Sequence, residues 1–409
     1  MKNKQLSILF LTNFAVFFIG MGLLPLLPLY AAQFGATPTG SGLYLASTYT
    51  AIALGTVLTG WLSNRLPLRQ LSISAGLAGL PALVLLGQAV ALWQVVVLTA
   101  VVWFCGGIGL ALVSIMISLY ADGSTRGRSF SLMFLARPLA GVLGGVTCGQ
   151  VVAWQGYPFM FVALGLVWAS WPVAAMLGME EQRPRADSPA PAAAADESST
   201  RIGGTFYLVL LAALLSSTTV YVGRLITSLS MQAFDLSPGA VASTAVVGGL
   251  VTFPITPLIG ILSDRLGRRR LLMVSYALAA GGVVLLSMAS QLWHFWLETA
   301  LLFVATAANG SVATALTTDV LPRDALRRGM SWLNSMTWVA GIIGFAGTGY
   351  LTERLGAAAT CLIAALLAVA AAGLLGWRPR RVTETVSLDW RSIILAPFSQ
   401  ARKKLLPDS

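Results

Sequence analysis

Twelve long apolar runs divide this sequence and constrain its fold more than any other feature. Each run has about 20 residues or more, which is enough for a helix to cross a hydrocarbon core of about 30 Å. An open segment in lipid satisfies its backbone polar groups only as a helix. An all-α membrane protein with 12 transmembrane helices is therefore predicted. The runs are 6–30, 41–63, 71–91, 93–120, 129–153, 157–178, 205–233, 240–262, 271–291, 293–318, 329–351 and 357–377.

The composition supports a membrane chain. Hydrophobic residues make up 56% of the 409 residues and charged residues 10%, against about 45–50% and about 25% in soluble domains. A short basic start, MKNK, precedes the first run, as it does in signal peptides. The length of the run, its Pro25 and Pro28, and the lack of a small-residue cleavage site indicate a retained span instead.

The basic residues predict the orientation of the chain. With a cytoplasmic N-terminus, 23 of the 26 Lys and Arg residues fall on the cytoplasmic side; Arg137 and Arg224 fall within spans and Arg354 falls outside. This is the positive-inside pattern of a multi-pass plasma (inner) membrane protein with both termini in the cytoplasm. The net charge of +11 is therefore assigned to topology and to contact with the lipid bilayer, not to nucleic acid.

The residue inventory argues against an enzyme. Cys105, Cys148 and Cys361 all lie within spans and lack metal-ligand spacing, so they are interpreted as small packing residues. His294 is the single histidine of the chain, and no Gly-rich phosphate loop is found. We expect no metal, no cofactor and no enzymatic activity.

A polar stretch at 179–203 and a repeat define the organisation. The stretch is rich in Pro, Ala, Ser and charges, as in flexible linkers. The predicted parts are an N-terminal six-helix bundle (1–178), this cytoplasmic linker (179–203), a C-terminal six-helix bundle (204–377) and a basic cytoplasmic tail (378–409). The tail is consistent with an amphipathic helix on the membrane surface or with disorder. An offset of 200 residues relates the halves without a gap, as in the pairs Phe34/Phe234, Pro38/Pro238, Gly60/Gly260, Arg65/Arg265, Trp93/Trp293, Arg128/Arg328, Gly141/Gly341, Gly144/Gly344, Gly149/Gly349 and Gly156/Gly356.

One loop motif carries a family resemblance. The stretch GILSDRLGRRR, residues 260–270, contains Gly-x-x-x-Asp-Arg-x-Gly-Arg-Arg, with Gly260, Asp264, Arg265, Gly267, Arg268 and Arg269 in the motif positions. Together with six plus six spans and a charged linker, it resembles the major facilitator superfamily of secondary transporters. The resemblance implies two bundles related by a pseudo-two-fold axis along the membrane normal and a cytoplasmic gate at this loop. A role in topology alone remains open.

The N-terminal copy of this motif is altered. In GWLSNRLPLRQ, residues 60–70, Gly60 and Arg65 are kept, but Asn64 replaces the Asp and Pro67 the second Gly. We infer that the N-terminal gate relies on a neutral hydrogen bond from Asn64 and on Arg65 and Arg69.

The fifth span carries a second, weaker resemblance. RPLAGVLGG, residues 137–145, is similar to the Gly-Pro-x-x-Gly-Gly signature of exporters in this superfamily, with Pro138, Gly141, Gly144 and Gly145 in suitable places and Arg137 at the first Gly position. Glycines at this spacing let helices approach closely. The pattern favours export, although glycine packing alone would produce it as well.

Polar residues within the spans are the candidates for substrate binding and coupling, because such groups are costly in a membrane. They are Asn13, Arg137, Tyr221, Arg224, Glu298, Asn309, Asn334 and Trp338. In the resembled family, spans one, four, seven and ten line the cavity, which matches Asn13, Arg224, Glu298 and Asn309 by span number.

Several of these candidates have alternative interpretations. Glu298 is the best candidate for a proton carrier, but it is also close enough to the span end to reach the interface. Arg224 can reach outward or pair with Glu298. The asparagines can serve as hydrogen bonds between helices.

The charge of the spans constrains the cargo. Two arginines against one glutamate leave a formal surplus of +1, which suits an anionic, zwitterionic or polyhydroxylated small molecule. The predicted function is secondary active transport by alternating access, as proton-coupled export (an antiporter), with a monomer sufficient for a complete pathway. A proton-coupled importer, a lipid flippase and a non-transporting sensor or scaffold are the alternatives.

Overall fold

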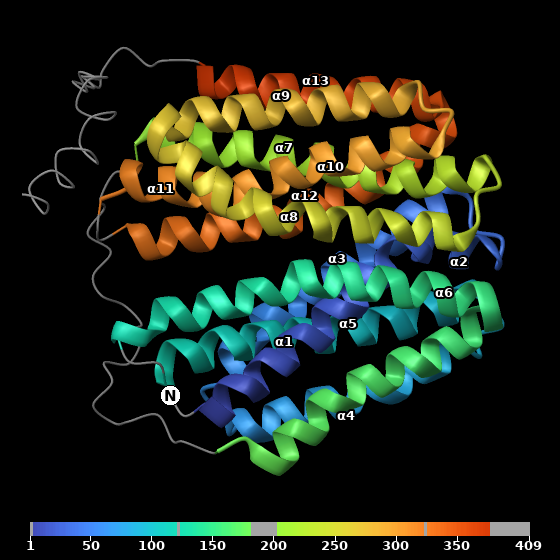
Figure 1. The fold of residues 1–409 in the computed structure, drawn as a ribbon, viewed down its shortest axis with the longest axis vertical. Helices are drawn as coiled ribbons and strands as arrows, with labels where there is room; N and C mark the ends of the chain where they lie inside the picture. The colour runs from blue at the N-terminus through green and yellow to red at the C-terminus, as the bar shows by residue number, and fades with distance from the viewer. Residues whose placement is uncertain (1–2, 121–122, 181–202, 323–324, 377–409) are drawn as a thin grey trace, which may run out of the picture. The chain divides into compact units, whose positions relative to one another are not determined.

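All secondary-structure elements among the residues that the structure describes are helices. The structure, a computed structural model, describes residues 3–120, 123–180, 203–322 and 325–376 (Figure 1). Most of the predicted linker 179–203 and the whole of the tail 378–409 lie outside these ranges. The helices are α1 (Asn3–Leu23), η1 (Leu24–Leu26), α2 (Leu27–Ala32), α3 (Pro38–Leu62), α4 (Leu68–Leu86), α5 (Leu92–Tyr120), α6 (Gly123–Gly178), α7 (Gly204–Ala233), α8 (Pro238–Leu266), α9 (Arg268–Ser287), α10 (Leu292–Ala308), η2 (Asn309–Ala313), α11 (Thr314–Val320), α12 (Leu326–Leu355) and α13 (Ala357–Gly376).

The described helices provide the twelve predicted spans. Ten stretches are long and apolar enough to cross a membrane, among the described residues. One of them, Ser131–Gly178, is two spans, because the α6 backbone breaks at Gly156, with φ of 75°. The 30-residue α12 is the twelfth crossing. The prediction of a 12-helix, all-α membrane protein is confirmed.

The 200-residue offset found in the sequence is also present in the helix boundaries. Helices α3 and α8 begin at Pro38 and Pro238. Helices α4 and α9 begin at residues 68 and 268, and α5 and α10 at residues 92 and 292. Gly156 and Gly356 both have positive φ, 75° and 83°. The two halves therefore repeat one helical arrangement.

The loop motif is where the two copies differ in backbone. Gly267 has a φ of 88° and ends α8, a conformation that favours glycine. Pro67 holds the equivalent position with a φ of −55°, because its ring fixes φ near −65°. The altered N-terminal motif therefore cannot form the same turn as the C-terminal copy.

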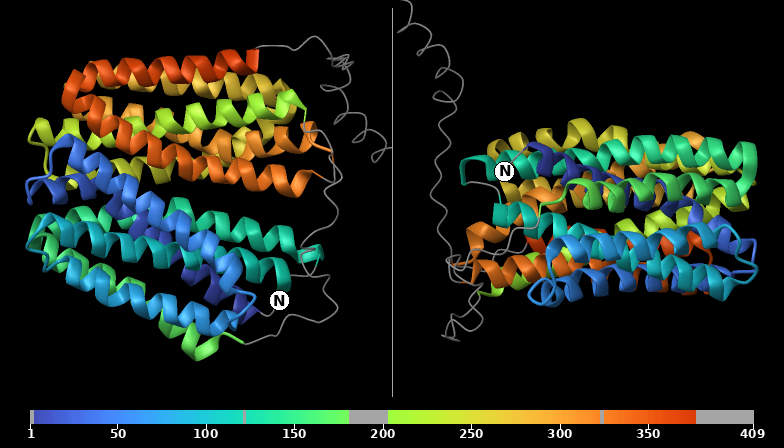
Figure 2. Two further views of the ribbon diagram at one scale, coloured as in Figure 1. Left: turned by 180° about the vertical axis from the view of Figure 1, so that it is seen from behind. Right: turned by 90° about the horizontal axis from the view of Figure 1, so that it is seen from below.

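Two helix pairs make the most extensive contacts between the halves. Helix α6 packs along α8, and α3 packs along α12. We call the end of the molecule with Pro38 and Pro238 the proline end, and the end with the 60–70 and 260–270 stretches the motif end. Figures 1 and 2 show the two groups of helices side by side at the proline end and diverging toward the motif end.

Small residues bring the halves into contact at the proline end. A β-carbon on Gly42 of α3 would lie 2.4 Å from the carbonyl oxygen of Phe345, and one on Gly349 of α12 would lie 2.4 Å from the carbonyl oxygen of Pro38. Glu353 of α12 adds a hydrogen bond, accepting from the backbone N–H of Thr39 at 2.9 Å. Within the described part of the chain, no hydrogen bond or ion pair joins the halves at the motif end.

The glycine-rich stretch of the fifth span packs on both sides of α6. A β-carbon on Gly145 would lie 2.9 Å from the carbonyl oxygen of Ala242 in α8, so this glycine lies at the junction of the halves. Gly141 faces Gly249 of α8 in the same way, and Pro138 contributes its carbonyl oxygen to that contact. Gly144 instead faces α1. This stretch therefore lies close to α8 on one side and to α1 on the other.

Candidate substrate cavity

A cavity of about 330 Å³ lies between the two halves. Both halves contribute to its walls through α1, α3, α5, α6, α7 and α12. It is lined by Val16, Phe17, Ile19, Gly20, Met21, Leu24, Tyr49, Ile52, Val102, Trp103, Gly106, Leu110, Arg137, Trp168, Tyr221, Arg224, Asn334, Thr337 and Trp338. The walls are thus mostly apolar and aromatic with a few polar groups, which is typical of small-molecule sites.

Five of the eight predicted substrate residues line this cavity. They are Arg137, Tyr221, Arg224, Asn334 and Trp338. The structure brings them together from three helices, α6, α7 and α12. The choice of polar residues within spans as candidates therefore identified a large part of the polar lining.

The cavity has two cationic groups and no carboxylate among its lining residues. Arg137 comes from the N-terminal half and Arg224 from the C-terminal half. The Arg137 guanidinium lies 6.0 Å from the ring centre of Phe17, and that of Arg224 lies 4.9 Å from Phe303 and 5.6 Å from Tyr221. Aromatic faces stabilise a cation at these distances, so each arginine is held by rings and not by an acidic partner.

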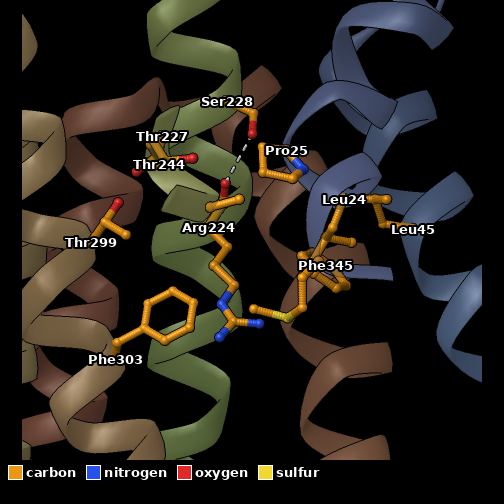
Figure 3. Close-up of a pocket in the computed structure, with 12 residues that line it drawn as sticks. Leu24, Pro25, Leu45, Arg224, Thr227, Ser228, Thr244, Thr299, Phe303 and Phe345 are labelled. Carbon is orange, nitrogen blue, oxygen red and sulfur yellow. Dashed lines mark hydrogen bonds between the residues drawn. The ribbon is translucent and has the colours of Figure 1, made fainter. Parts of the chain in front are cut away.

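Arg224 also borders a second, smaller cavity of about 40 Å³ on the side of α8 and α10. Four hydroxyl side chains line part of it, namely Thr227, Ser228, Thr244 and Thr299, and most of its other lining residues are apolar. In Figure 3 the Arg224 side chain extends away from Ser228 and ends beside Phe303. Its Nε and Nη2 atoms are buried and have no hydrogen-bond partner in the protein. An unpaired buried charge is costly, so these two nitrogen atoms are unsatisfied polar groups of the site.

Glu298 lies behind this smaller cavity. Its side chain is 0% exposed, which argues against the alternative that it reaches the membrane interface. Oε2 accepts hydrogen bonds from the hydroxyls of Thr227 at 3.0 Å and Thr299 at 3.2 Å, while Oε1 is buried without a partner. No ion pair joins Glu298 to Arg224, so the predicted alternative of a direct pair is not present in this conformation.

Two asparagine candidates do not line the cavity. Asn13 donates from Nδ2 to the carbonyl oxygen of Met133 at 2.9 Å, which ties α1 to α6. Asn309 accepts from the Tyr276 hydroxyl at 2.6 Å and donates toward Ser216 and Ser217. It begins the π-helical turn η2, a feature found often at functional sites. In this structure both asparagines form hydrogen bonds between helices, which is the alternative that the sequence analysis gave to substrate binding.

Arg268 and Arg269 of the C-terminal loop motif form bonds within their own half. Arg268 donates to the carbonyl oxygen of Ala315 at 2.9 Å and forms an ion pair with Asp319, and Arg269 donates to the carbonyl oxygen of Leu375. Asp264 is exposed and has no hydrogen bond or ion pair among the described residues. Its role as a gate stays a prediction.

Among the described residues, the contacts of the N-terminal copy also lie within its own half. Asn64 donates to the carbonyl oxygen of Gly60 at 3.2 Å, in its own helix. Arg65 stacks on Trp61 at 3.9 Å, and Arg69 donates to the carbonyl oxygen of Met176 at 2.7 Å. The predicted neutral hydrogen bond from Asn64 exists, but it does not cross to the other half in this conformation.

The sequence analysis missed several aromatic residues of the site. Tyr49 lines the cavity and its ring centre lies 5.0 Å from those of Tyr221 and Phe345. Comparison of the two copies could have identified it, because position 249, which is 200 residues later, is a glycine. Phe17 and Trp103 lie in apolar runs, where nothing in the local sequence separates a cavity-lining ring from a packing ring.

Comparisons with known proteins agree with this architecture. The family model described as Major Facilitator Superfamily matches residues 9–231 and 209–407. The multidrug resistance protein MdtG of Proteus mirabilis (strain HI4320) is 23% identical over 342 residues, covering 78% of this chain and 82% of that protein.

Solved structures share the fold at low identity. A bacterial homologue of the human lysosomal transporter Spinster, in an inward-facing and occupied conformation, has a TM-score of 0.75 at 14% identity, covering 91% of this chain and 98% of the other. A D-xylose–proton symporter has a TM-score of 0.71 at 16% identity, covering 94% and 98%. With a family match over nearly its whole length and a cavity between two repeated bundles, this chain belongs to the Major Facilitator Superfamily, and its fold is that of a transporter of small molecules.

Proposed function

We propose that the protein exports a small anionic or polyhydroxylated molecule across the plasma membrane by alternating access, in exchange for protons. The motif end faces the cytoplasm in this proposal, because the loops there carry most of the Lys and Arg residues. The conformation is then open toward the cytoplasm and closed toward the outside.

The observation that carries the proposal is the position of the cavity. It lies between the halves. Tight contacts close the space toward the proline end, whereas no hydrogen bond joins the described parts of the halves at the motif end. A cavity blocked at one end and lined by both halves suits a site that rocking of the halves exposes alternately. The gate role of the motif residues belongs to the opposite state, in which the motif end is closed.

Export is supported by two independent features. The relative from Proteus mirabilis is named as a multidrug resistance protein. The stretch 137–145, which is similar to the exporter signature, packs α6 against α8 of the other half. Both favour outward movement of cargo.

Glu298 is the proposed proton carrier. It is a buried carboxylate whose Oε1 has no donor, and that oxygen is free to take a proton. Its neighbours Thr227 and Thr299 line the smaller cavity that Arg224 also borders. A change of charge at Glu298 therefore acts on Arg224 at short range through an interior of low dielectric.

A proton-coupled importer is the second candidate, and the charges of the cavity favour it. An anion near Arg224 and a proton on Glu298 each reduce charge repulsion for the other, so the two bind together more readily than apart. Joint binding leads to transport of both in one direction. The sense of the proton gradient distinguishes the two candidates.

Transport in sealed vesicles tests the proposal. A thermal-shift screen of the purified protein against sugars, organic anions, lipids and drugs first supplies a ligand. We expect inside-out vesicles with an acidic lumen to accumulate that ligand, because the lumen then corresponds to the cell exterior. Accumulation only when protons and ligand enter the lumen together would establish the importer.

The Glu298→Gln variant tests the proton carrier. It keeps the size and the hydrogen-bonding oxygen of the side chain but cannot release a proton. We expect it to bind the ligand and to exchange it across the membrane without concentrating it. If Glu298→Gln still concentrates the ligand under a proton gradient, Glu298 is not the carrier.

A further inference from the structure

Each half contributes one arginine and one partly exposed aromatic ring to the cavity lining. In the N-terminal half, Arg137 lies near the partly exposed ring of Phe17. In the C-terminal half, Arg224 lies near Tyr221, and the partly exposed Trp338 lies 6.1 Å from Tyr49. All of these side chains line the same cavity. Charge and aromatic surface are thus offered from both sides of one space.

We propose that the cargo is a planar aromatic anion, with its acidic group between Arg137 and Arg224 and its ring against Phe17 and Trp338. This inference rests on the proposed function, in which the cavity carries the cargo. It goes beyond a preference for anions, because it requires a flat ring and contact with both halves.

The anionic group follows from the hydrogen-bonding state of the arginines. Nε and Nη2 of Arg224 are buried without a partner in the protein. The cavity lining contains a second guanidinium and no carboxylate, so two like charges repel each other across it. An anion that contacts both groups removes the repulsion and supplies the missing acceptors. A cation would add to the repulsion.

The aromatic ring follows from the shape and chemistry of the walls. Two uncharged polar lining residues, Asn334 and Thr337, lie on α12 close to Trp338, whereas the other walls are mainly rings and aliphatic chains. A sugar needs many hydrogen-bonding partners, and the lining has few. A flat ring gains stacking contacts of the kind already formed by Tyr49, Tyr221 and Phe345, whose ring centres are 5.0 to 5.2 Å apart.

Binding to both halves also couples the affinity of the cargo to the conformation of the protein. Arg137 lies on α6 and Arg224 on α7, which belong to different halves. A single anion held by both arginines links the halves, so its affinity depends on their relative positions. A ligand shifts a conformational equilibrium only through such a difference in affinity.

A matched series of ligands tests the proposal. Isothermal titration of the purified full-length protein would compare 2-naphthoate with its saturated decalin carboxylate, with 2-naphthamide, and with 2-(aminomethyl)naphthalene as the cation. We expect 2-naphthoate to bind about ten-fold or more tightly than the amide and the cation, because charge-assisted hydrogen bonds contribute about that much. We expect a preference of about three-fold or more over the decalin acid from stacking.

Variants assign the two preferences to residues. Arg137→Gln and Arg224→Gln should each remove the preference for 2-naphthoate over 2-naphthamide, whereas Arg354→Gln, at an exposed position outside the cavity, should not. Trp338→Leu should remove the preference over the decalin acid and keep the preference over the amide. Trp61→Leu is the matched control for loss of a tryptophan. Melting temperature and size-exclusion profile confirm that each variant is folded.

The proposal is overturned if 2-naphthoate does not bind, if the decalin acid or the cation binds as tightly, or if either arginine variant keeps the charge preference while folded. These outcomes leave the proposed transport function intact, because a ligand of another class found in the thermal-shift screen would still be transported. If the screen ligand binds but no ligand crosses the membrane, the proposed function fails separately.

Discussion

Replacing Gly349 by alanine should open the cavity toward the proline end. The new β-carbon would lie 2.4 Å from the carbonyl oxygen of Pro38, 2.9 Å from the Cα of Gly42 and 3.0 Å from the Cα of Thr39. All three are backbone atoms of the opposing region, so no side-chain rotation relieves the contact. The two halves must separate at this crossing, which disfavours the conformation described above.

The contact distances indicate the size of the effect. Overpacking a close interface by one methyl group costs about 1–3 kcal/mol, and each 1.4 kcal/mol or so is a factor of about ten in an equilibrium. The ratio of the closed to the open proline end should therefore fall by about 5- to 150-fold. The matched control is Gly347→Ala on the same helix, where a β-carbon meets nothing within 4 Å. Both changes share the intrinsic gain of alanine over glycine in a helix.

A single reporter cysteine measures the shift. Thr337 lines the cavity, and Thr337→Cys in a chain whose buried Cys105, Cys148 and Cys361 are replaced gives one labelling site. A membrane-impermeant maleimide is applied to each side of sealed vesicles. Gly349→Ala should raise the labelling rate from the proline end and lower it from the motif end.

One labelling result would contradict this prediction. If Gly349→Ala and Gly347→Ala are labelled alike from both sides, the close contact does not hold the proline end closed and the reasoning is refuted. Gly42→Ala provides an independent repeat, because its β-carbon would lie 2.4 Å from the carbonyl oxygen of Phe345. A melting temperature close to that of the parent shows that a changed labelling pattern is not unfolding.

Two further predictions follow from named contacts. Gly223→Ala would place a β-carbon 2.6 Å from Oε1 of Glu298, so it should lower the melting temperature and weaken proton-driven transport, whereas Gly281→Ala, with nothing within 4 Å, should leave transport unchanged. Glu353, two residues beyond the predicted 329–351 span, accepts hydrogen bonds from the side chain and backbone of Thr39, which hold the pKa of this exposed carboxyl below its ordinary value of 4.5. Because the lowered pKa belongs to the closed proline end, this contact is present above pH 4.5 and is lost as the pH falls through the lowered value. Glu353→Gln should raise labelling from the proline end at neutral pH and abolish the rise that acid produces in the parent; an unchanged acid response would contradict this.

The sequence alone determined the number of spans, the division into two halves and the repeat between them. These follow from local properties, since a run of apolar residues in lipid has few alternatives to a helix. The 200-residue register was readable because the two copies still share turn residues such as Pro38 and Pro238. In the sequence, Gly156 appeared only as part of the gap between the runs 129–153 and 157–178. The structure shows that helix extends to Gly156 from both sides and that the backbone breaks there.

The positions of the polar residues within the bundle were only partly determined by the sequence. Burial cost selects residues such as Arg137 and Arg224 as functional candidates wherever they occur in a span. It does not tell whether a polar group faces a cavity or a neighbouring helix. Asn13 was selected by the same argument, yet it bonds to the carbonyl oxygen of Met133.

Only the tertiary structure decided which side chains share the cavity and which end of the molecule is closed. Helical periodicity gives the face on which a residue lies, but the rotation of each helix depends on close packing with its neighbours, as at Gly42 and Gly349. That packing places Tyr49 among the rings of the other half and Glu298 against Thr227 and Thr299, two threonines of the smaller cavity. Contacts between residues hundreds of positions apart have no local pattern in the sequence, which is why the site required the assembled fold.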